Sequence, residues 1–178
     1  MIVGLVLLCT VVAFAQTEAP MAQAELQNSQ GEVVGLATFT EGINGVMVVA
    51  HVHKIEPGFH GFHIHETGKC TPPDFKSAGD HFNPFEAQHG LRDPDGRHAG
   101  DLPNLLVSPD GTGSIVTYAP LVILGEGKQS LFHPEGTALV IHAKPGDLKT
   151  DPAGDAGNRV ACGRIIKIEK AKQAAVKN

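Results

Sequence analysis

A His-x-His pair lies inside a short apolar run, Gly61-Phe62-His63-Ile64-His65-Glu66. In a β-strand the side chains alternate between two faces, so Phe62 and Ile64 would enter a core while His63 and His65 share the opposite face. The rise of about 3.3 Å per residue places the two imidazoles about 6 to 7 Å apart, close enough to lean toward one metal ion. The pattern predicts either half of a metal site or two solvated histidines on a strand.

The segment from Thr67 to Asp110 carries further groups of the kind that bind metals. It is rich in Gly, Pro and Asp and has no sustained apolar periodicity, which predicts a long functional loop. Imidazole nitrogen and carboxylate oxygen are ligands that tetrahedral zinc accepts. The candidate ligands in this loop are His81, His89, His98 and Asp101. Scattered surface histidines are the alternative for any one of them, but in a chain with ten histidines their joint occurrence favours a metal centre.

Four other side chains have simpler interpretations. His51 and His53 form a second His-x-His pair, but no acidic or cysteine partner lies nearby in sequence, so we predict two exposed imidazoles on a strand. His133 precedes a proline in a predicted turn and is expected at the surface. Glu66 is expected to face solvent or a backbone group rather than to act as a base.

The N-terminus has the pattern of an export signal. An apolar run ends in Ala13-Phe14-Ala15, the small-x-small pattern that signal peptidase cleaves. We therefore predict a signal peptide over residues 1–15, too short to span a membrane, and a disordered leader over residues 16–23. Lipid attachment at Cys9 is the minor alternative. The predicted location is periplasmic or extracellular.

Export leaves Cys70 and Cys162 as the only cysteines of the mature chain. One pair of cysteines in an oxidising compartment predicts a single disulfide, with two free buried thiols as the alternative. The loop that this bond would close spans roughly 90 residues, worth about 4.6 kcal/mol in the chain-entropy model.

Composition predicts one all-β domain, over residues 24–169. The mature chain of about 160 residues is long enough for one sizeable core. Trp is absent, Gly and Pro are frequent, and the short apolar segments are rich in Val, Ile and Thr, as in β proteins with many turns. The net charge of -5 and the lack of a basic stretch argue against nucleic-acid binding. The predicted strands include 24–27, 32–39, 46–55, 113–119, 121–124, 136–144 and 159–169, with a second long loop over 145–158 and a basic tail over 170–178.

Several separate motifs, in one order along the chain, resemble the copper/zinc superoxide dismutases. They are Gly61 to Glu66, Gly79-Asp80-His81-Phe82-Asn83-Pro84, His89-Gly90, Arg97 to Leu102, the strand into His142, and Gly157 to Gly163. The similarity runs from about residue 24 to residue 168. It implies an eight-stranded Greek-key β-barrel with an immunoglobulin-like sandwich architecture, in which two long loops hold the metals.

The resemblance also implies a role for each candidate residue. It implies copper bound by His63, His65, His81 and His142, and zinc bound by His81, His89, His98 and Asp101, with His81 bridging the two metals. Arg159 would guide an anion beside the copper, a Cys70–Cys162 disulfide would tie the first loop to the last strand, and His60 would bond backbone.

The implied activity is the dismutation of superoxide to dioxygen and hydrogen peroxide. Imidazoles suit both copper oxidation states of a one-electron cycle, and zinc, which has no redox chemistry, would serve as a fixed charge and loop organiser. In this cycle His81 would leave the copper and carry a proton. The permanent charge of a guanidinium would attract the anionic substrate without a protonation step.

The sequence departs from the family pattern at two positions. Gly146 stands where the family has the first of two aspartates, which hydrogen-bonds one copper histidine and one zinc histidine, and Asp147 follows it. Loss of such an outer partner typically costs about 10- to 100-fold in metal affinity or activity, so we predict weakened zinc retention with copper binding largely kept. Asp155 stands where asparagine is more familiar, and its charge predicts a modest loss of superoxide attraction at Arg159.

Two other functions remain as alternatives. One is a non-catalytic domain of the same fold that stores or delivers copper and zinc, which the complete copper set and Arg159 disfavour. The other is a zinc hydrolase, which needs an open coordination position and a base for the bound water, whereas the zinc set here has four protein ligands. The expected partner is the superoxide anion, with no nucleic acid and no stable membrane association. A homodimer is among the assemblies that the resemblance allows.

Overall fold

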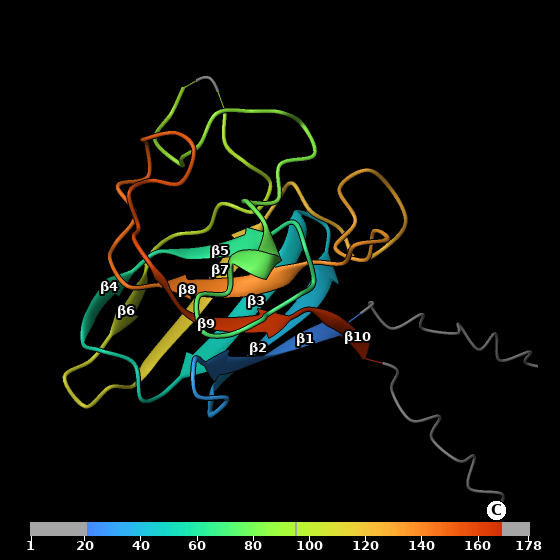
Figure 1. Ribbon diagram of the computed structural model, residues 1–178. Helices are drawn as coiled ribbons and strands as arrows, with labels where there is room; N and C mark the ends of the chain where they lie inside the picture. The colour runs from blue at the N-terminus through green and yellow to red at the C-terminus, as the bar shows by residue number, and fades with distance from the viewer. Residues whose placement is uncertain (1–20, 95, 169–178) are drawn as a thin grey trace, which may run out of the picture.

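The computed structural model describes residues 21–94 and 96–168, all in short strands, turns and loops (Figure 1). The predicted signal peptide, residues 16–20 of the predicted leader and the basic tail lie outside these residues. No helix in the described part of the chain is long and apolar enough to cross a membrane. The elements are β1 (Met21–Asn28), β2 (Val33–Gly42), β3 (Gly45–Val52), β4 (Gly58–His60), β5 (Phe62–His65), the 3-10 turn η1 (Lys76–Ala78), β6 (Leu105–Val107), β7 (Gly113–Ala119), β8 (Ala138–His142), β9 (Arg159–Arg164) and β10 (Ile166–Ile168).

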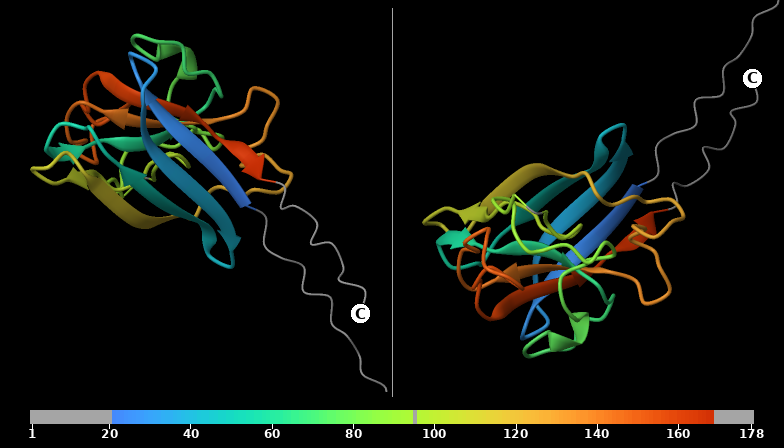
Figure 2. Two further views of the ribbon diagram at one scale, coloured as in Figure 1. Left: turned by 90° about the horizontal axis from the view of Figure 1, so that it is seen from below. Right: turned by 90° about the horizontal axis from the view of Figure 1, so that it is seen from above.

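The strands form one antiparallel sheet that curls into a nearly closed barrel (Figure 2). Their order is β4-β6-β7-β3-β2-β1-β9-β8-β5, and β10 pairs with β1 off this path. β4 and β5 lie at opposite ends of this order, yet they are successive parts of one extended segment interrupted at Gly61. Gly61 donates its N–H to Lys144 O and accepts from His142 N, both at 2.8 Å. The segment that carries His63 and His65 therefore joins the two edges of the sheet.

The predicted all-β Greek-key barrel of eight strands is confirmed. β9 and β10 are likewise one segment, interrupted at Ile165, so the ten strands make eight extended segments. β3 pairs with β2 and β7, and the chain leaves β3 to reach β4 at the far edge of the sheet, which is a Greek-key crossing.

The core is built by the expected period of two. Phe62 and Ile64 of β5 are fully buried in the main core, and Leu139 and Ile141 of β8 pack in the same cluster. The opposite faces of β5 and β8 are also buried, because the two long loops cover them. By contrast His51 on β3 is exposed, as predicted.

The two long loops lie against each other over β5 and β8 (Figure 1). Arg92 N, in the first loop, donates to Leu148 O in the second at 3.0 Å. The predicted disulfide is confirmed: Cys70 of the first loop is bonded to Cys162 of β9, 92 residues away. A covalent bond and loop-to-loop contacts thus hold both loops on the barrel.

Three boundary predictions are wrong. Residues 21–23, predicted as leader, belong to β1, where they pair with β2 on one side and β10 on the other. Residues 105–107, predicted as loop, form β6, which is too short to produce a visible alternation in the sequence. Residues 121–124 form no strand and make only the single bridge Ile123–Ser130, because Pro120, Gly125 and Gly127 interrupt the segment.

Candidate metal centre

Four buried histidines meet beside the barrel. His63 and His65 come from β5, His142 ends β8, and His81 joins them through a backbone bridge between residues 65 and 81. One ring nitrogen from each lies within 4.8 Å of those of the others. We call these residues, His63, His65, His81 and His142, the four-histidine group. Two strands of the barrel thus position three of its members.

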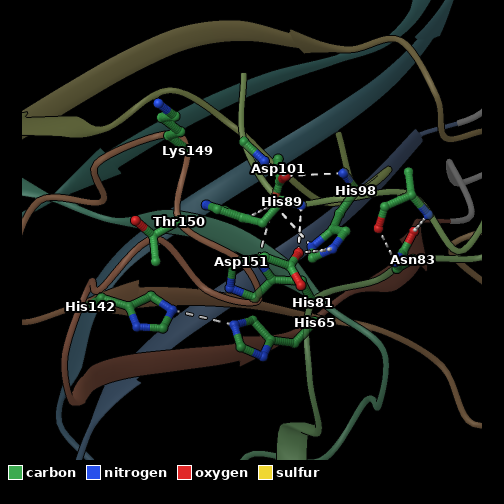
Figure 3. Close-up of polar contacts among 12 residues, drawn as sticks. His65, His81, Asn83, His89, His98, Asp101, His142, Lys149, Thr150 and Asp151 are labelled. Atoms are coloured by element: carbon green, nitrogen blue, oxygen red, sulfur yellow. Dashed lines mark hydrogen bonds and ion pairs between the residues drawn. The ribbon is translucent and has the colours of Figure 1, made fainter. Parts of the chain in front are cut away.

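Backbone carbonyls orient two of these rings. Nδ1 of His65 lies 2.9 Å from Gly79 O, and Nδ1 of His142 lies 3.2 Å from Gly157 O. Because a carbonyl only accepts, each Nδ1 carries the proton and each Nε2 presents a lone pair. The two Nε2 atoms face each other at 3.3 Å (Figure 3). Two lone pairs at this distance repel unless a cation or a proton lies with them.

A second group surrounds one carboxylate oxygen. Oδ1 of Asp101 lies 3.0 Å from Nδ1 of His81, 3.0 Å from Nδ1 of His89 and 3.6 Å from Nδ1 of His98. Oδ2 of Asp101 accepts from the backbone N–H groups of Gly90 at 2.9 Å and His98 at 3.0 Å, which fixes the carboxylate. The donor atoms of His81, His89, His98 and Asp101, the Asp101 group, all lie within 4.8 Å of one another.

His81 belongs to both groups. Its Nδ1 faces Asp101, and its Nε2 is buried without a hydrogen-bond partner in the described structure. The ring centroid lies 4.1 Å from that of His63 and 4.9 Å from that of His65. One imidazole therefore separates the two groups, with a nitrogen available on each side.

Unpaired buried nitrogens show that the two groups fit metal ions. Among the described residues, buried ring nitrogens without a hydrogen bond occur on five histidines, of which His63, His81, His89 and His98 belong to the two groups and His133 lies outside them. Each unpaired buried polar atom costs about 1–3 kcal/mol, and one cation in each group would satisfy several at once. An all-imidazole set suits copper, and three imidazoles with one carboxylate suit tetrahedral zinc.

The electrostatics favour the ligand forms of these side chains. Burial lowers the pKa of His63 and of His65 well below the ordinary value, and the neighbouring His81 lowers both further. Burial likewise lowers the pKa of His142 to about 4. Burial would raise the pKa of Asp101, but the hydrogen bond from His81 and the close imidazoles of His89 and His98 hold it far below its usual range. At neutral pH His63, His65, His142 and Asp101 therefore need lose no proton to bind a metal.

Arg159 is the one cation among the residues that line the pocket in front of the four-histidine group, where His65, His81 and His142 also lie. Its Nη1 donates to Phe75 O at 2.7 Å and its Nη2 to Gly79 O at 2.6 Å. Burial lowers the pKa of Arg159, and the charges of Asp80 and Asp74 oppose this shift. The guanidinium is thus held in place by two carbonyls at the pocket wall.

The copper/zinc superoxide dismutase (SODC) family model matches residues 33–165 of the chain. The chain belongs to the copper/zinc superoxide dismutase family. It is 46% identical over 161 residues to Superoxide dismutase [Cu-Zn] 1 of Aquifex aeolicus (strain VF5), which covers 89% of this chain and 95% of that protein. It is 38% identical over 154 residues to the superoxide dismutase-like protein YojM of Bacillus subtilis (strain 168), covering 85% and 79% of the two chains.

A solved structure agrees with this assignment. The crystal structure of a SOD-like protein from Bacillus subtilis superposes with a TM-score of 0.78 at 38% identity, covering 81% of this chain and 97% of that chain. The four-histidine group and the Asp101 group match the copper and zinc sites of the superoxide dismutase family.

The backbone at Gly146, where the resemblance implies an aspartate, lies beside His63 and provides no hydrogen-bond partner for its ring. Asn104 holds the Gly146 backbone, donating Nδ2–H to Gly146 O at 2.8 Å and accepting from Gly146 N at 2.9 Å. Asp147 is exposed and accepts from the N–H groups of Lys149 and Thr150 at 2.9 and 2.8 Å, and from the Thr150 hydroxyl. Asp147 is therefore used within its own turn. Nε2 of His63 and Nε2 of His89 have no partner in the described structure.

Two contacts at the site had no signal in the sequence. Asn104 reaches Gly146 from 42 residues away, and Asp151 Oδ1 accepts from His89 N at 2.7 Å from 62 residues away. Both are pairings between loops, which no local spacing reveals. Asp151 Oδ1 also lies 3.7 Å from His98 Nε2, so it supports two members of the Asp101 group.

The other histidines are placed as follows. His60 lies 2.7 Å from the carbonyls of His142 and Glu56, so it bonds backbone as predicted. His133 lies in a turn as predicted, but it is half-buried rather than fully at the surface, and its ring stacks on Phe82 with centroids 5.3 Å apart. Glu66 accepts from a backbone N–H, that of Asp80, as expected.

Proposed function

We propose that this protein is a superoxide dismutase, with copper in the four-histidine group and zinc in the Asp101 group. The observation that carries the proposal is the pair of buried ligand groups that share His81 and open into a pocket beside Arg159. The redox site would thus have an open side, and the open side has a fixed positive charge.

The reaction requires the site to bind an anion twice and to deliver protons, since two superoxide anions and two protons give one dioxygen and one hydrogen peroxide. Bound copper supplies a one-electron centre, and zinc supplies a fixed charge. Arg159 attracts and orients each anion without being titrated, because a guanidinium stays charged. His81 Nε2, which has no protein partner, can take one proton and release it to the reduced substrate, with the second coming from water.

One observation favours the alternative, a domain that stores or delivers metal without turnover. Glu66, Asp80 and Asp151 line the same pocket as Arg159, so three carboxylates surround the entrance. Negative charge at a pocket mouth attracts cations and repels superoxide. A relative in Bacillus subtilis is named superoxide dismutase-like, so a test of activity on this chain decides between the two functions.

The test is the rate of superoxide decay with the copper- and zinc-loaded mature chain, at low and at high ionic strength. We expect fast decay that slows with salt, because salt screens attraction by Arg159. His142→Gln, which removes a member of the four-histidine group, should abolish the rate. His51→Gln, in an exposed histidine outside both groups, should leave it unchanged. A parent rate no higher than that of copper bound to an unrelated protein would refute the proposal.

We also propose that the chain is exported to a periplasmic or extracellular location. The disulfide between Cys70 and Cys162 supports this, because such bonds persist in oxidising compartments. N-terminal sequencing of the chain recovered from the periplasm or medium tests it, with Gln16 as the expected first residue.

We further propose that a second copy of the chain covers the outer face of β3, β4, β6 and β7. Phe59 and Leu106 are paired across β4 and β6 and are 55% and 52% exposed, and Val116 and Tyr118 on β7 are 68% and 55% exposed. These four strands contain no Asp, Glu, Lys or Arg. In a two-fold dimer the same face of each subunit meets its equivalent on the other. Because the chain has a net charge of -5, a face without charged side chains avoids repulsion between the two subunits.

A further inference from the structure

The side chain of Glu66 is bound to the loop segment that leads to His81. Glu66 N donates to Asp80 O at 2.9 Å, and Asp80 N donates back to Glu66 Oε1 at 3.2 Å. One residue further, Thr67 N donates to Ala78 O at 2.9 Å. Hydrogen bonds from the backbone and the side chain of Glu66, and from the backbone of Thr67, thus hold residues 78–80 on both sides of Gly79.

Gly79 has a backbone conformation and a lack of side chain that let Glu66 pack against it. Its φ is +74°, a conformation that favours glycine. A Cβ on Gly79 would lie 2.7 Å from Glu66 Oε1 and 2.8 Å from Glu66 Cγ, so the glutamate side chain occupies the space that any other residue would fill. The absence of a Cβ on Gly79 thus lets the Glu66 side chain pack closely on the Gly79 peptide.

The Gly79 carbonyl holds two residues of the site. It accepts from His65 Nδ1 at 2.9 Å and from Arg159 Nη2 at 2.6 Å. A shift of this one oxygen would turn the imidazole of His65 and move the guanidinium of Arg159 together. We propose that Glu66 is a positioning residue of the four-histidine group, which sets the orientation of His65 and Arg159 by fixing the Gly79 carbonyl. This inference rests on the proposed function only in that the group binds copper.

A competing role for Glu66 follows from its charge. Glu66 is exposed and lines the pocket that contains Arg159. In this second role its carboxylate would act through its charge alone, by repelling anions from the pocket. The two roles predict opposite effects. Removing a repelling charge strengthens anion binding, whereas releasing the Gly79 carbonyl weakens it and changes the coordination of the copper.

The experiment compares Glu66→Ala with Glu66→Gln in copper-loaded protein. Glutamine removes the charge but keeps an oxygen that can accept from Asp80 N. Asp110→Ala is the matched control, because Asp110 Oδ1 also accepts a backbone N–H, that of Thr112 at 3.0 Å, in a turn outside the pocket. The measurements are the electron paramagnetic resonance spectrum of copper(II) and the affinity for azide by optical titration at low ionic strength.

We expect the Glu66→Ala protein to show an altered copper(II) spectrum and about fivefold weaker azide binding, the size expected for one lost hydrogen bond. The Glu66→Gln and Asp110→Ala proteins should keep the parent spectrum, and Glu66→Gln should bind azide at least as tightly as the parent. An unchanged spectrum in Glu66→Ala, or equal azide affinities in the two Glu66 variants, would overturn the inference. Neither measurement needs turnover, so a protein that binds copper but leaves superoxide intact would refute only the proposed function.

Discussion

An aspartate at position 146 should give a hydrogen-bond partner to the buried imidazole of His63, whose ring lies beside that of His89. Nε2 of His63 and Nε2 of His89 have no hydrogen-bond partner among the described residues. A Cβ on Gly146 would lie 3.8 Å from His63 Cε1 and 3.4 Å from Asn104 Oδ1, both ordinary contacts. Gly146 does not have the positive φ that would strain a side chain. The substitution Gly146→Asp therefore fits, and its carboxylate would point toward His63.

The size of the effect follows from the burial of these nitrogens. An imidazole that binds a metal through one nitrogen carries a proton on the other, and such an N–H buried without an acceptor costs about 1–3 kcal/mol. Outer hydrogen-bond partners of metal ligands typically change metal affinity by about 10- to 100-fold, or about 1.4 to 2.7 kcal/mol. We expect Gly146→Asp to tighten the binding of copper, through His63 itself, and of zinc, through His89 beside it, each within this range.

The assay is competition for zinc against a coloured chelator, with the parent protein, Gly146→Asp and Gly146→Ala at neutral pH. Alanine fills the Cβ position without adding an acceptor, so it isolates the contribution of the carboxylate. If Gly146→Asp holds zinc no more tightly than the parent, or if alanine gives the same gain, the unpaired imidazoles do not limit zinc affinity.

Three further predictions follow from the charges and faces described above. Asp80→Asn should raise the superoxide rate at low salt about twofold, because the negative charge of Asp80 acts on Arg159. Asp155→Asn should change the rate less, and a larger effect of Asp155→Asn would show that Asp155 is the carboxylate that weakens superoxide attraction. The folded pKa of His142 is about 4, below an unfolded value of about 6.5, so the unfolded chain binds more protons between these values. The free energy of unfolding of metal-free protein should therefore fall by on the order of 3 kcal/mol from pH 6.5 to pH 4, and a flat profile in denaturant titrations would contradict this. Val116→Lys should yield a monomer in sedimentation, while Gln23→Lys on β1 should sediment like the parent, which we expect to be a dimer.

The parts of the site that lie on strands could be predicted from the sequence. The alternation through Phe62, His63, Ile64 and His65 assigns one face to the core and one to the ligands, and the structure has this arrangement. The exposure of His51 followed from the same logic, because no ligand neighbours it in sequence. Local periodicity is sufficient to predict the environment of a side chain wherever the strand that carries it fixes the face on which it lies.

Contacts between the two loops could not be predicted in this way. Asn104 with Gly146 and Asp151 with His89 depend on how two irregular segments meet, and irregular segments have no period. The same limit explains why the sequence predicts that the charge of Asp155 acts on Arg159. Its nearness to Arg159 in sequence stood in for nearness in space, whereas Asp80 and Asp74, far away in sequence, are the carboxylates whose charges oppose the lowering of the pKa of Arg159 by burial.

The division of ligands between strands and loop suits the two groups to different roles. Three members of the four-histidine group are fixed by β5 and β8, so this half is largely formed by the barrel itself. All four members of the Asp101 group come from one loop, which must be ordered before they converge. His81 lies in this loop and belongs to both groups, so ordering of the loop by zinc also places the fourth histidine of the other group. Weak zinc binding at this centre would thus leave three copper ligands in place and loosen the one that separates the two metals.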